Sequence, residues 1–172
     1  MKRLIAAIAF AAEKHRNQRR KDAEASPYIN HPIALANVLA NEAGIDDERV
    51  LIAAILHDTI EDTETTVQEL VKRFGQEVAD IVLEVTDDKS LAKDERKRLQ
   101  VTHARSISRR AKLVKPADKI RNVRDIADCP PASWSLERRR EYISWAASVV
   151  DQLRGVHPEL ERLSDDASKS PP

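Results

Sequence analysis

The most chemically distinctive part of the sequence is a group of four ionisable residues that follows an apolar run. Residues 50–56 are apolar, and His57 and Asp58 come directly after them. Glu61 lies four positions after His57. Asp62 lies four positions after Asp58, so one further helical turn would crowd all four side chains onto one side. Such groups at the end of a buried helix are destabilising unless they are paired or bound to a metal. Because a divalent cation offsets the repulsion between crowded carboxylates, the spacing predicts a metal site.

Two other polar residues stand apart from this group. His31 precedes a proline at the start of a predicted helix, since proline suits the first helical position. Asp118 is a lone acid among the bases of residues 115–122. A simpler structural interpretation exists for the first group: Asp58 could cap a helix. His57 could equally be a histidine satisfied within the core.

The composition indicates a helical protein of one domain. The chain has 172 residues, with 29 Lys plus Arg against 29 Asp plus Glu, three glycines and two each of Trp, Tyr and Phe. This length suits one domain with a sizeable core. Few glycines and aromatic residues argue against a turn-rich β-sandwich, and the many helix-forming residues favour helices. The expected fold class is therefore all-α, in a single domain.

The predicted elements are eight or so helices separated by loops. Asp46 or Asp47, Thr66 and Ser135 are the expected caps of three of them. Helices are expected over residues 1–16, 31–43, 48–58, 67–74, 76–85, 93–110, 112–127 and 136–154. Pro116 is a flaw in the seventh, since an interior proline costs ~3 kcal/mol unless the helix kinks or starts there. A domain over residues 1–164 is expected to end in a disordered tail over residues 165–172.

Charge and hydropathy restrict the compartment and the partners. Residues 57–69 hold five acids and no Lys or Arg, and residues 93–124 hold twelve bases and three acids. This asymmetry predicts a metal site beside a polyanion site, although solvated helix surfaces can carry similar charge runs. The longest apolar run, residues 4–12, is far short of the ~20 residues needed to cross a bilayer, so no membrane partner is expected. Cys129, the single cysteine, favours a reducing, cytoplasmic compartment over secretion.

A histidine, a His-Asp pair and an aspartate spread over three predicted helices resemble the HD superfamily of metal-dependent phosphohydrolases. The resemblance becomes specific through ordered motifs: HRNQRRKD at 15–22, YINHP at 28–32, LHDTIEDT at 56–63, FG at 74–75, VTDDK at 85–89 and KPADK at 115–119. Over roughly residues 4–154 the chain is similar to the hydrolase domain of the RelA/SpoT homologues. Among these, it resembles the stand-alone small alarmone hydrolases, the group that includes the metazoan SpoT-like enzyme. The domain over residues 1–164 is accordingly expected to be of the HD type.

The resemblance implies an enzyme that removes the 3′-pyrophosphate of guanosine tetraphosphate (ppGpp) and pentaphosphate (pppGpp). The products would be GDP or GTP and pyrophosphate. The family uses Mn²⁺, one ion per chain, held at the positions that match His31, His57, Asp58 and Asp118. Two imidazoles and two carboxylates form a mixed nitrogen and oxygen set that suits Mn²⁺ or Fe²⁺. Glu61 and Asp62 match the catalytic pair that the family associates with activating water and handling the leaving-group proton.

The resemblance also implies residues that bind the nucleotide. Arg20 and Lys21 match residues at the guanine-binding edge of the pocket, where arginine can stack its plane on a base. Asn122 matches a residue that contacts the nucleoside, and Tyr142 one on the phosphate side. The candidates for binding the 5′-diphosphate are Lys93, Arg96, Lys97, Arg98 and Lys115, of which only Lys97 and Arg98 are kept, as the weaker predictions.

Two positions depart from the pattern of the family. Pro116 stands where many relatives carry leucine, so Asp118 is expected near the start or a kink of its helix. Arg121 stands where relatives often carry an aromatic residue or histidine, so contacts around the nucleotide are expected to differ. Trp134 and Trp145 are expected to belong to the core.

Two other functions remain open. The same site could act on another phosphoester, such as the 2′-phosphate of NADPH, a dNTP or a cyclic nucleotide. A non-enzymatic RNA binder using residues 93–124 is disfavoured by zero net charge and few aromatic residues. The expected partner is thus a small nucleotide and no nucleic acid, and the oligomeric state is left open. Because the resemblance covers only the hydrolase domain, the chain is expected to degrade the alarmone and not to make it.

Overall fold

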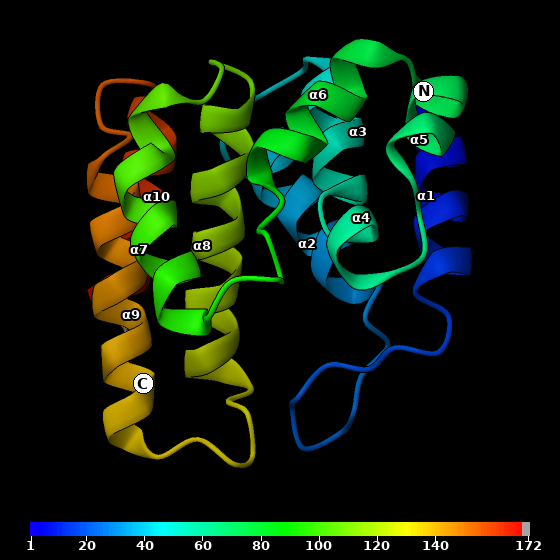
Figure 1. Ribbon diagram of the computed structural model, residues 1–172. Helices are drawn as coiled ribbons and strands as arrows, with labels where there is room; N and C mark the ends of the chain where they lie inside the picture. The colour runs from blue at the N-terminus through cyan, green and yellow to red at the C-terminus, as the bar shows by residue number, and fades with distance from the viewer. Residues whose placement is uncertain (170–172) are drawn as a thin grey trace.

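The computed structural model describes residues 1–169, and their regular structure is helical (Figure 1). The expectation of an all-α domain is confirmed. The α-helices are α1 (Lys2–Lys14), α2 (Asn30–Asn37), α3 (Glu48–Leu56), α4 (Thr59–Asp62), α5 (Val67–Phe74), α6 (Gln76–Val85), α7 (Lys93–His103), α8 (Ala111–Asp128), α9 (Leu136–Asp151) and α10 (Pro158–Lys169). A π-helical segment, η1 (Val38–Glu42), continues α2, and a 3₁₀ turn, η2 (Ala104–Ser106), follows α7. None of the described helices is long and apolar enough to cross a bilayer.

Side-chain caps explain where three of the helices begin. The side chain of Asp47 accepts a hydrogen bond from the backbone N–H of Arg49 at the start of α3. Thr66 and Ser135 cap α5 and α9 in the same way. Each cap satisfies one of the N–H groups that lack a partner in the first helical turn. The predicted caps are therefore confirmed, with Asp47 rather than Asp46 at α3.

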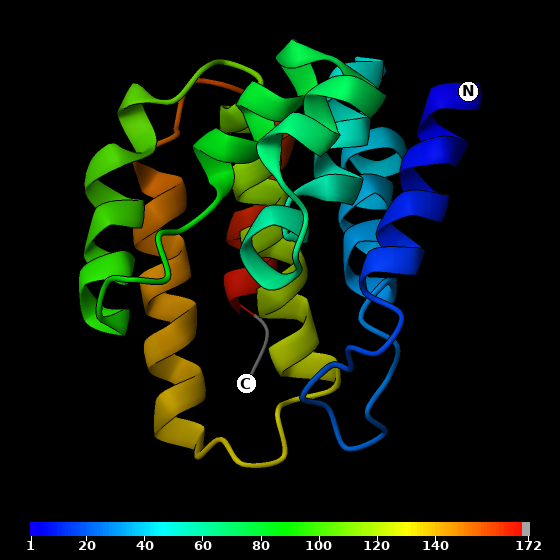
Figure 2. The same cartoon turned by 45° about the vertical axis from the view of Figure 1, so that its right-hand side comes forward.

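Helix α3 lies at the centre of the core. It packs against α1, α2, α6 and α8, and Ile52, Ala53 and Leu56 on it are fully buried. On the other side of α8 lie α9 and α10, and Figure 2 shows α10, in red, behind α8. Because α3 ends in the middle of the molecule, the residues that follow it face α2 and α8 rather than solvent.

Two predicted helix ends and the irregularity predicted at Pro116 were wrong. The helix expected over residues 93–110 ends at His103, because Ile107 is extended and Ser108 bonds instead to Glu84 through its backbone N–H and its hydroxyl group. The helix expected to reach Arg154 ends at Asp151. Helix α8 runs through Pro116 without a break, so Asp118 lies inside the helix and not at its start.

The C-terminal helix α10 was missed altogether. Residues 165–169 belong to it, so the expected domain end at residue 164 falls within a helix, and residues 170–172 of the expected tail lie outside the described part. Leu160, Leu163 and Ala167 are buried against the core. The signal was present in the sequence: Pro158 stands at the first helical position, and apolar residues follow at helical spacing.

Candidate metal centre and nucleotide pocket

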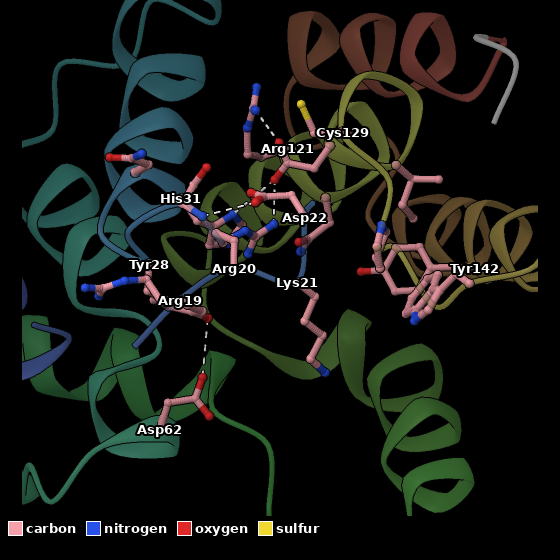
Figure 3. A pocket seen from close by; sticks show the side chains of 17 residues that line it. Arg19, Arg20, Lys21, Asp22, Tyr28, His31, Asp62, Arg121, Cys129 and Tyr142 are labelled. Carbon is pink, nitrogen blue, oxygen red and sulfur yellow. Dashed lines mark hydrogen bonds and ion pairs between the residues drawn. The ribbon is translucent and has the colours of Figure 1, made fainter. Parts of the chain in front are cut away.

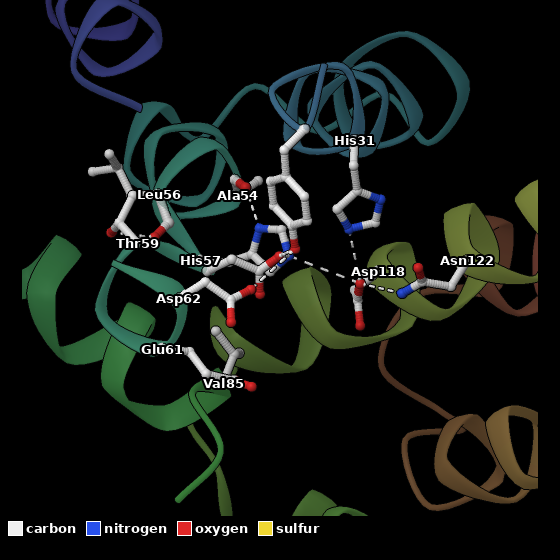
Figure 4. Close-up of polar contacts among 12 residues, drawn as sticks. His31, Ala54, Leu56, His57, Thr59, Glu61, Asp62, Val85, Asp118 and Asn122 are labelled. Atoms are coloured by element: carbon white, nitrogen blue, oxygen red, sulfur yellow. Dashed lines mark hydrogen bonds and ion pairs between the residues drawn. The ribbon is translucent and has the colours of Figure 1, made fainter. Parts of the chain in front are cut away.

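Three elements bring a group of possible metal ligands together. His31 lies in the first turn of α2, His57 directly after α3 and Asp118 in α8, and their side chains point toward one another (Figure 4). Their nearest ligand atoms all lie within 4.8 Å of one another. Both histidines are buried, and Asp118 is nearly so. This convergence of residues far apart in the sequence identifies a candidate site for a divalent metal.

The distances fit one ion. The Nε2 atom of His31 lies 3.3 Å from Asp118 Oδ1, and the Nε2 atom of His57 lies 3.9 Å from the same oxygen. Asp58 also faces the group, with Oδ2 2.9 Å from His57 Nε2. Ligand atoms held at about 2.1 Å from a common ion lie roughly 3 to 4 Å apart. Three of the four predicted ligands, His31, His57 and Asp118, form one compact group, and Asp58 lies beside it without belonging to it.

The hydrogen bonds of His57 prepare it to bind a metal. Its Nδ1 atom lies 2.8 Å from the carbonyl oxygen of Ala54, which can only accept a hydrogen bond, so Nδ1 carries the proton. The Nε2 atom is buried, faces Asp58 and Asp118, and has no hydrogen-bond partner in the described structure. A buried ring nitrogen aimed at two carboxylates is what a nitrogen and oxygen site for a divalent cation requires.

The electrostatics of the centre favour charged ligands. Burial tends to raise the pKa of Asp58, but the nearby histidines outweigh it and hold that pKa well below its usual range. Burial also opposes ionisation of Asp118, and there Lys119 and the histidines lower the pKa. Burial lowers the pKa of His57, but Asp58 and Asp118 outweigh burial and raise that pKa to about 9. Because a ligating nitrogen must be unprotonated, a cation bound here would compete with a proton for Nε2.

Glu61 and Asp62 lie one turn beyond the metal group, in α4. Burial is the main reason that the pKa of Glu61 rises to about 7, with Asp58, Asp87 and Asp62 adding repulsion. The backbone N–H of Asp87 donates a hydrogen bond to Glu61 Oε2. Asp62 forms an ion pair with Lys89. A carboxylate with a pKa near neutrality is suited to accept a proton from water.

Two adjoining cavities open beside this cluster. The smaller, of about 220 Å³, is the metal pocket, and it is lined by all four predicted ligands together with Glu61 and Asp62. The larger, of about 480 Å³, is lined by residues predicted to bind a nucleotide, and we name it the nucleotide pocket (Figure 3). The two cavities share several lining residues: Arg20, Tyr28, His31, Asp62, Asn122 and Tyr142. These shared residues form a common boundary between the two cavities.

Most of the predicted nucleotide-binding residues line these cavities. Arg20 and Tyr142 face both, and Lys21 lines the nucleotide pocket (Figure 3). Asn122 also faces both, and its amide group donates a hydrogen bond to Asp118 Oδ1, 2.6 Å away. Burial raises the pKa of Tyr142 to about 12, so its hydroxyl group is a hydrogen-bond donor at neutral pH.

The other two candidates line neither cavity. Arg98 is exposed and pairs with Glu95 on the outer face of α7. Lys97 lies over the ring of Trp145, 5.0 Å from its centroid, and lines neither cavity. The sequence could not show which basic side chains of α7 face the site, because this helix has no buried residue and therefore no apolar face that would orient it.

Several residues that line the cavities were missed or placed elsewhere. Tyr28 donates a hydrogen bond to Asp58, and Asp125 lines the nucleotide pocket. Lys115 is buried beside the metal pocket, and burial lowers its pKa to about 8. Trp134 lines the nucleotide pocket, and Trp145 packs on the core but also lines the metal pocket. The spacing of Asp118 and Asp125, two helical turns apart, could have indicated that they share a face of α8.

Comparison with known proteins agrees with this geometry. Residues 7–144 match the HD-domain family. The chain is 56% identical over 162 residues to the guanosine-3′,5′-bis(diphosphate) 3′-pyrophosphohydrolase MESH1 of Xenopus tropicalis, which covers 94% of this chain and 90% of that protein. It is 57% identical over 158 residues to the human MESH1 protein, covering 92% and 88%. The chain belongs to the HD-domain family of MESH1-type proteins.

A solved structure extends the similarity to three dimensions. It is that of a metazoan orthologue of SpoT that hydrolyses ppGpp and plays a role in starvation responses. The TM-score is 0.94 at 48% sequence identity, over 97% of this chain and 94% of the other. Nearly the whole helical arrangement of this chain is therefore shared with that solved structure.

Proposed function

We propose that this protein hydrolyses the 3′-diphosphate of ppGpp and pppGpp, with Mn²⁺ bound by His31, His57, Asp58 and Asp118. The observation that carries the proposal is a cavity lined by the four predicted metal ligands beside a larger cavity lined by arginine and aromatic side chains. The high identity to MESH1 proteins, which bear the name of this activity, supports it. A free, exposed Cys129 is consistent with a reducing, cytoplasmic setting.

In this reaction the oxygen of a water molecule bonds to the phosphorus attached to the 3′-oxygen, and the bond between that phosphorus and the 3′-oxygen breaks. The 3′-oxygen takes up a proton, leaving GDP or GTP and pyrophosphate. A divalent ion at this site would lower the pKa of bound water and polarise the phosphate. Glu61, with a pKa of about 7, can accept the proton of the water, and Asp62 lies beside it.

Other residues bind and orient the nucleotide. The side chains of Lys115 and Lys119 lie beside the metal pocket and supply positive charge next to a transferring phosphate. Arg20 lies on the wall shared by the two cavities, where its guanidinium plane can stack on the base. The rings of Trp134 and Tyr142, with centroids 5.5 Å apart, form an aromatic part of the wall of the nucleotide pocket.

A product analysis tests the proposal. Purified protein is stripped of metal, reloaded with Mn²⁺ and incubated with ppGpp, and the products are separated by anion-exchange chromatography. GDP and pyrophosphate in equal amounts are expected, with no turnover by the stripped sample. A parallel panel compares kcat/KM for ppGpp, pppGpp and NADPH. A higher kcat/KM for NADPH, with release of inorganic phosphate, would identify the other phosphoester activity as the main one.

A further inference from the structure

Asp125 lies where three nitrogen-bearing side chains converge at the edge of the nucleotide pocket. Its Oδ2 atom accepts a hydrogen bond from Arg20 at 2.6 Å, and its Oδ1 atom accepts one from Arg121. The same Oδ2 atom lies 3.9 Å from Nδ1 of His31. Asp125 sits on the face of α8 that also carries Asp118, two helical turns earlier.

The histidine in this contact lacks a partner on one side. The Nε2 atom of His31 faces Asp118 in the metal pocket, 3.3 Å from Oδ1. Its Nδ1 atom is buried and has no hydrogen-bond partner in the described structure. A histidine that ligates a metal normally donates its other N–H group to a carboxylate or carbonyl group, which fixes its tautomer and the orientation of the ring. Asp125 is the carboxylate that faces Nδ1, at 3.9 Å, a distance longer than a hydrogen bond.

Arg20, which also contacts Asp125, belongs to the part of the site that is predicted to bind the nucleotide base. Arg20 lines both cavities, and its guanidinium group lies over the ring of Tyr28, 5.8 Å from the centroid. A long side chain loses conformational freedom when it is held in one place. The ion pair with Asp125 holds Arg20 against the pocket wall before any nucleotide arrives.

We propose that Asp125 is a positioning residue that serves both halves of the site, orienting the metal ligand His31 and the base-binding residue Arg20 through one carboxylate oxygen. The inference rests on the proposed function for the roles of those two residues. Arg121 completes the arrangement, because a second guanidinium group on Oδ1 fixes the plane of the carboxylate. Arg121, which departs from the family pattern, thus forms an ion pair with Asp125 one turn further along α8.

Metal binding by the stripped protein gives a readout that does not depend on catalysis. Mn²⁺ is titrated into wild type, Asp125→Asn and Asp125→Ala by calorimetry. The expected affinity of Asp125→Ala is about tenfold to a hundredfold weaker, the usual effect of losing the partner of a ligating histidine. Asp125→Asn keeps an acceptor oxygen for Nδ1 and should lose less. The matched control is Asp128→Ala, which removes an exposed aspartate of the same helix that lines neither cavity.

Steady-state kinetics at saturating Mn²⁺ tests whether Asp125 holds Arg20 in place for nucleotide binding. Asp125→Asn should raise KM for ppGpp several-fold or more while kcat changes little, because Arg20 is no longer held in place. In the double variant with Arg20→Ala, the two effects on KM should not add, since both act through the same contact. Circular dichroism of each variant reports whether the helical fold survives.

The outcomes separate this inference from the proposed function. If wild type binds Mn²⁺ and hydrolyses ppGpp but both Asp125 variants match it in metal affinity and in KM, the positioning role is overturned while the function stands. Additive effects of the Arg20 and Asp125 changes on KM would overturn the coupling to Arg20. If wild type itself neither binds Mn²⁺ nor hydrolyses ppGpp, the proposed function fails, and this inference fails with it.

Discussion

The hydroxyl group of Tyr28 donates a hydrogen bond to Oδ2 of Asp58, 2.5 Å away, and lies 3.3 Å from Oδ2 of Asp62. Burial and the two carboxylates raise the pKa of Tyr28 above its usual value, so its hydroxyl group is protonated and acts as a donor at neutral pH. A single phenol therefore links a predicted metal ligand to a predicted catalytic carboxylate.

Replacing Tyr28 by phenylalanine should lower kcat without loss of the bound metal. A hydrogen bond to a charged group contributes about 1.5–3 kcal/mol, which corresponds to roughly tenfold to a hundredfold in rate if it is fully expressed in the transition state. We expect kcat to fall within that range and Mn²⁺ still to bind. Unchanged kcat and metal affinity would mean that Tyr28 serves only to fill space.

Replacing Asp58 by alanine should remove the bound metal and the activity together. The carboxylate lies 2.9 Å from His57 Nε2, and no other described carboxylate lies as close to that atom. Metal content measured by atomic spectroscopy should fall to background, with the helical circular dichroism spectrum retained. A variant that keeps its Mn²⁺ and its turnover would contradict the ligand assignment.

The double variant Glu61→Gln and Asp62→Asn should separate chemistry from metal binding. Positioned acid–base groups contribute at least ~10²-fold, so kcat should fall by that factor while Mn²⁺ affinity survives. In wild type, Glu61 must be ionised to accept a proton, and its pKa of about 7 predicts that activity falls as the pH falls. A bound cation favours the ionised carboxylate, so the acidic limb of the kcat profile should lie at or below pH 7. A profile without that limb would remove Glu61 from the role of base.

Much of this arrangement could be predicted from the sequence, and the reason is local. His57 and Asp58 end an apolar helix, and that position alone made them candidates for a buried polar site. The caps at Thr66 and Ser135 depend on neighbouring residues, so short patterns were sufficient to place them. What the resemblance to a family added was the link from this pair to His31 and Asp118, which lie on other helices.

The features that were missed depend on contacts between distant segments. The hydrogen bond between Tyr28 and Asp58 and the ion pair between Arg20 and Asp125 join parts of the chain that only folding brings together. Pro116 was expected to disturb α8, but its ring lies buried within a helix that neighbouring helices hold in place. Packing of this kind overrides local propensity.

Replacing Lys115 by methionine should stabilise the protein and impair its function. The Lys115 side chain is buried, forms no ion pair among the described residues, and makes one hydrogen bond of 3.4 Å to the carbonyl group of Val85. Burial lowers its pKa from 10.5 to about 8. The unfolded chain therefore binds more protons than the folded one between pH 8 and 10.5, and the free energy of unfolding of wild type rises across that window.

Below pH 8 Lys115 is charged in the folded and in the unfolded protein, so the full free-energy cost of burying that charge applies. Lys115→Met should therefore raise the free energy of unfolding by up to about 3 kcal/mol there. The gain should shrink as the pH rises toward 10.5. Urea denaturation at pH 7 and pH 10 measures both values. At the same time kcat/KM for ppGpp should fall, because a cation beside the metal pocket is lost. Equal stability of the two proteins at both pH values would contradict the assignment of an unpaired buried charge.

Replacing Arg20 by alanine and by lysine distinguishes stacking from simple attraction. The Arg20 guanidinium group lies on the wall shared by both cavities and pairs with Asp125. Stacking of a side chain on a base contributes ~1–3 kcal/mol, or roughly tenfold to a hundredfold in affinity. Arg20→Ala should therefore raise KM for ppGpp by about that factor with little loss of Mn²⁺.

Arg20→Lys should not restore KM, because lysine keeps the charge but lacks the planar face and cannot bind Asp125 and a base at once. If Arg20 instead attracted the phosphates over a distance, lysine would recover most of the affinity. Added salt would then weaken wild type as strongly as the alanine substitution does, since screening acts on exposed charges and much less on desolvated stacking. Measuring KM for wild type, Arg20→Ala and Arg20→Lys at two salt concentrations decides between the two. If Arg20→Lys restores KM and the KM of wild type depends steeply on salt, stacking is contradicted. If KM stays high in both variants at both salt concentrations, stacking is supported.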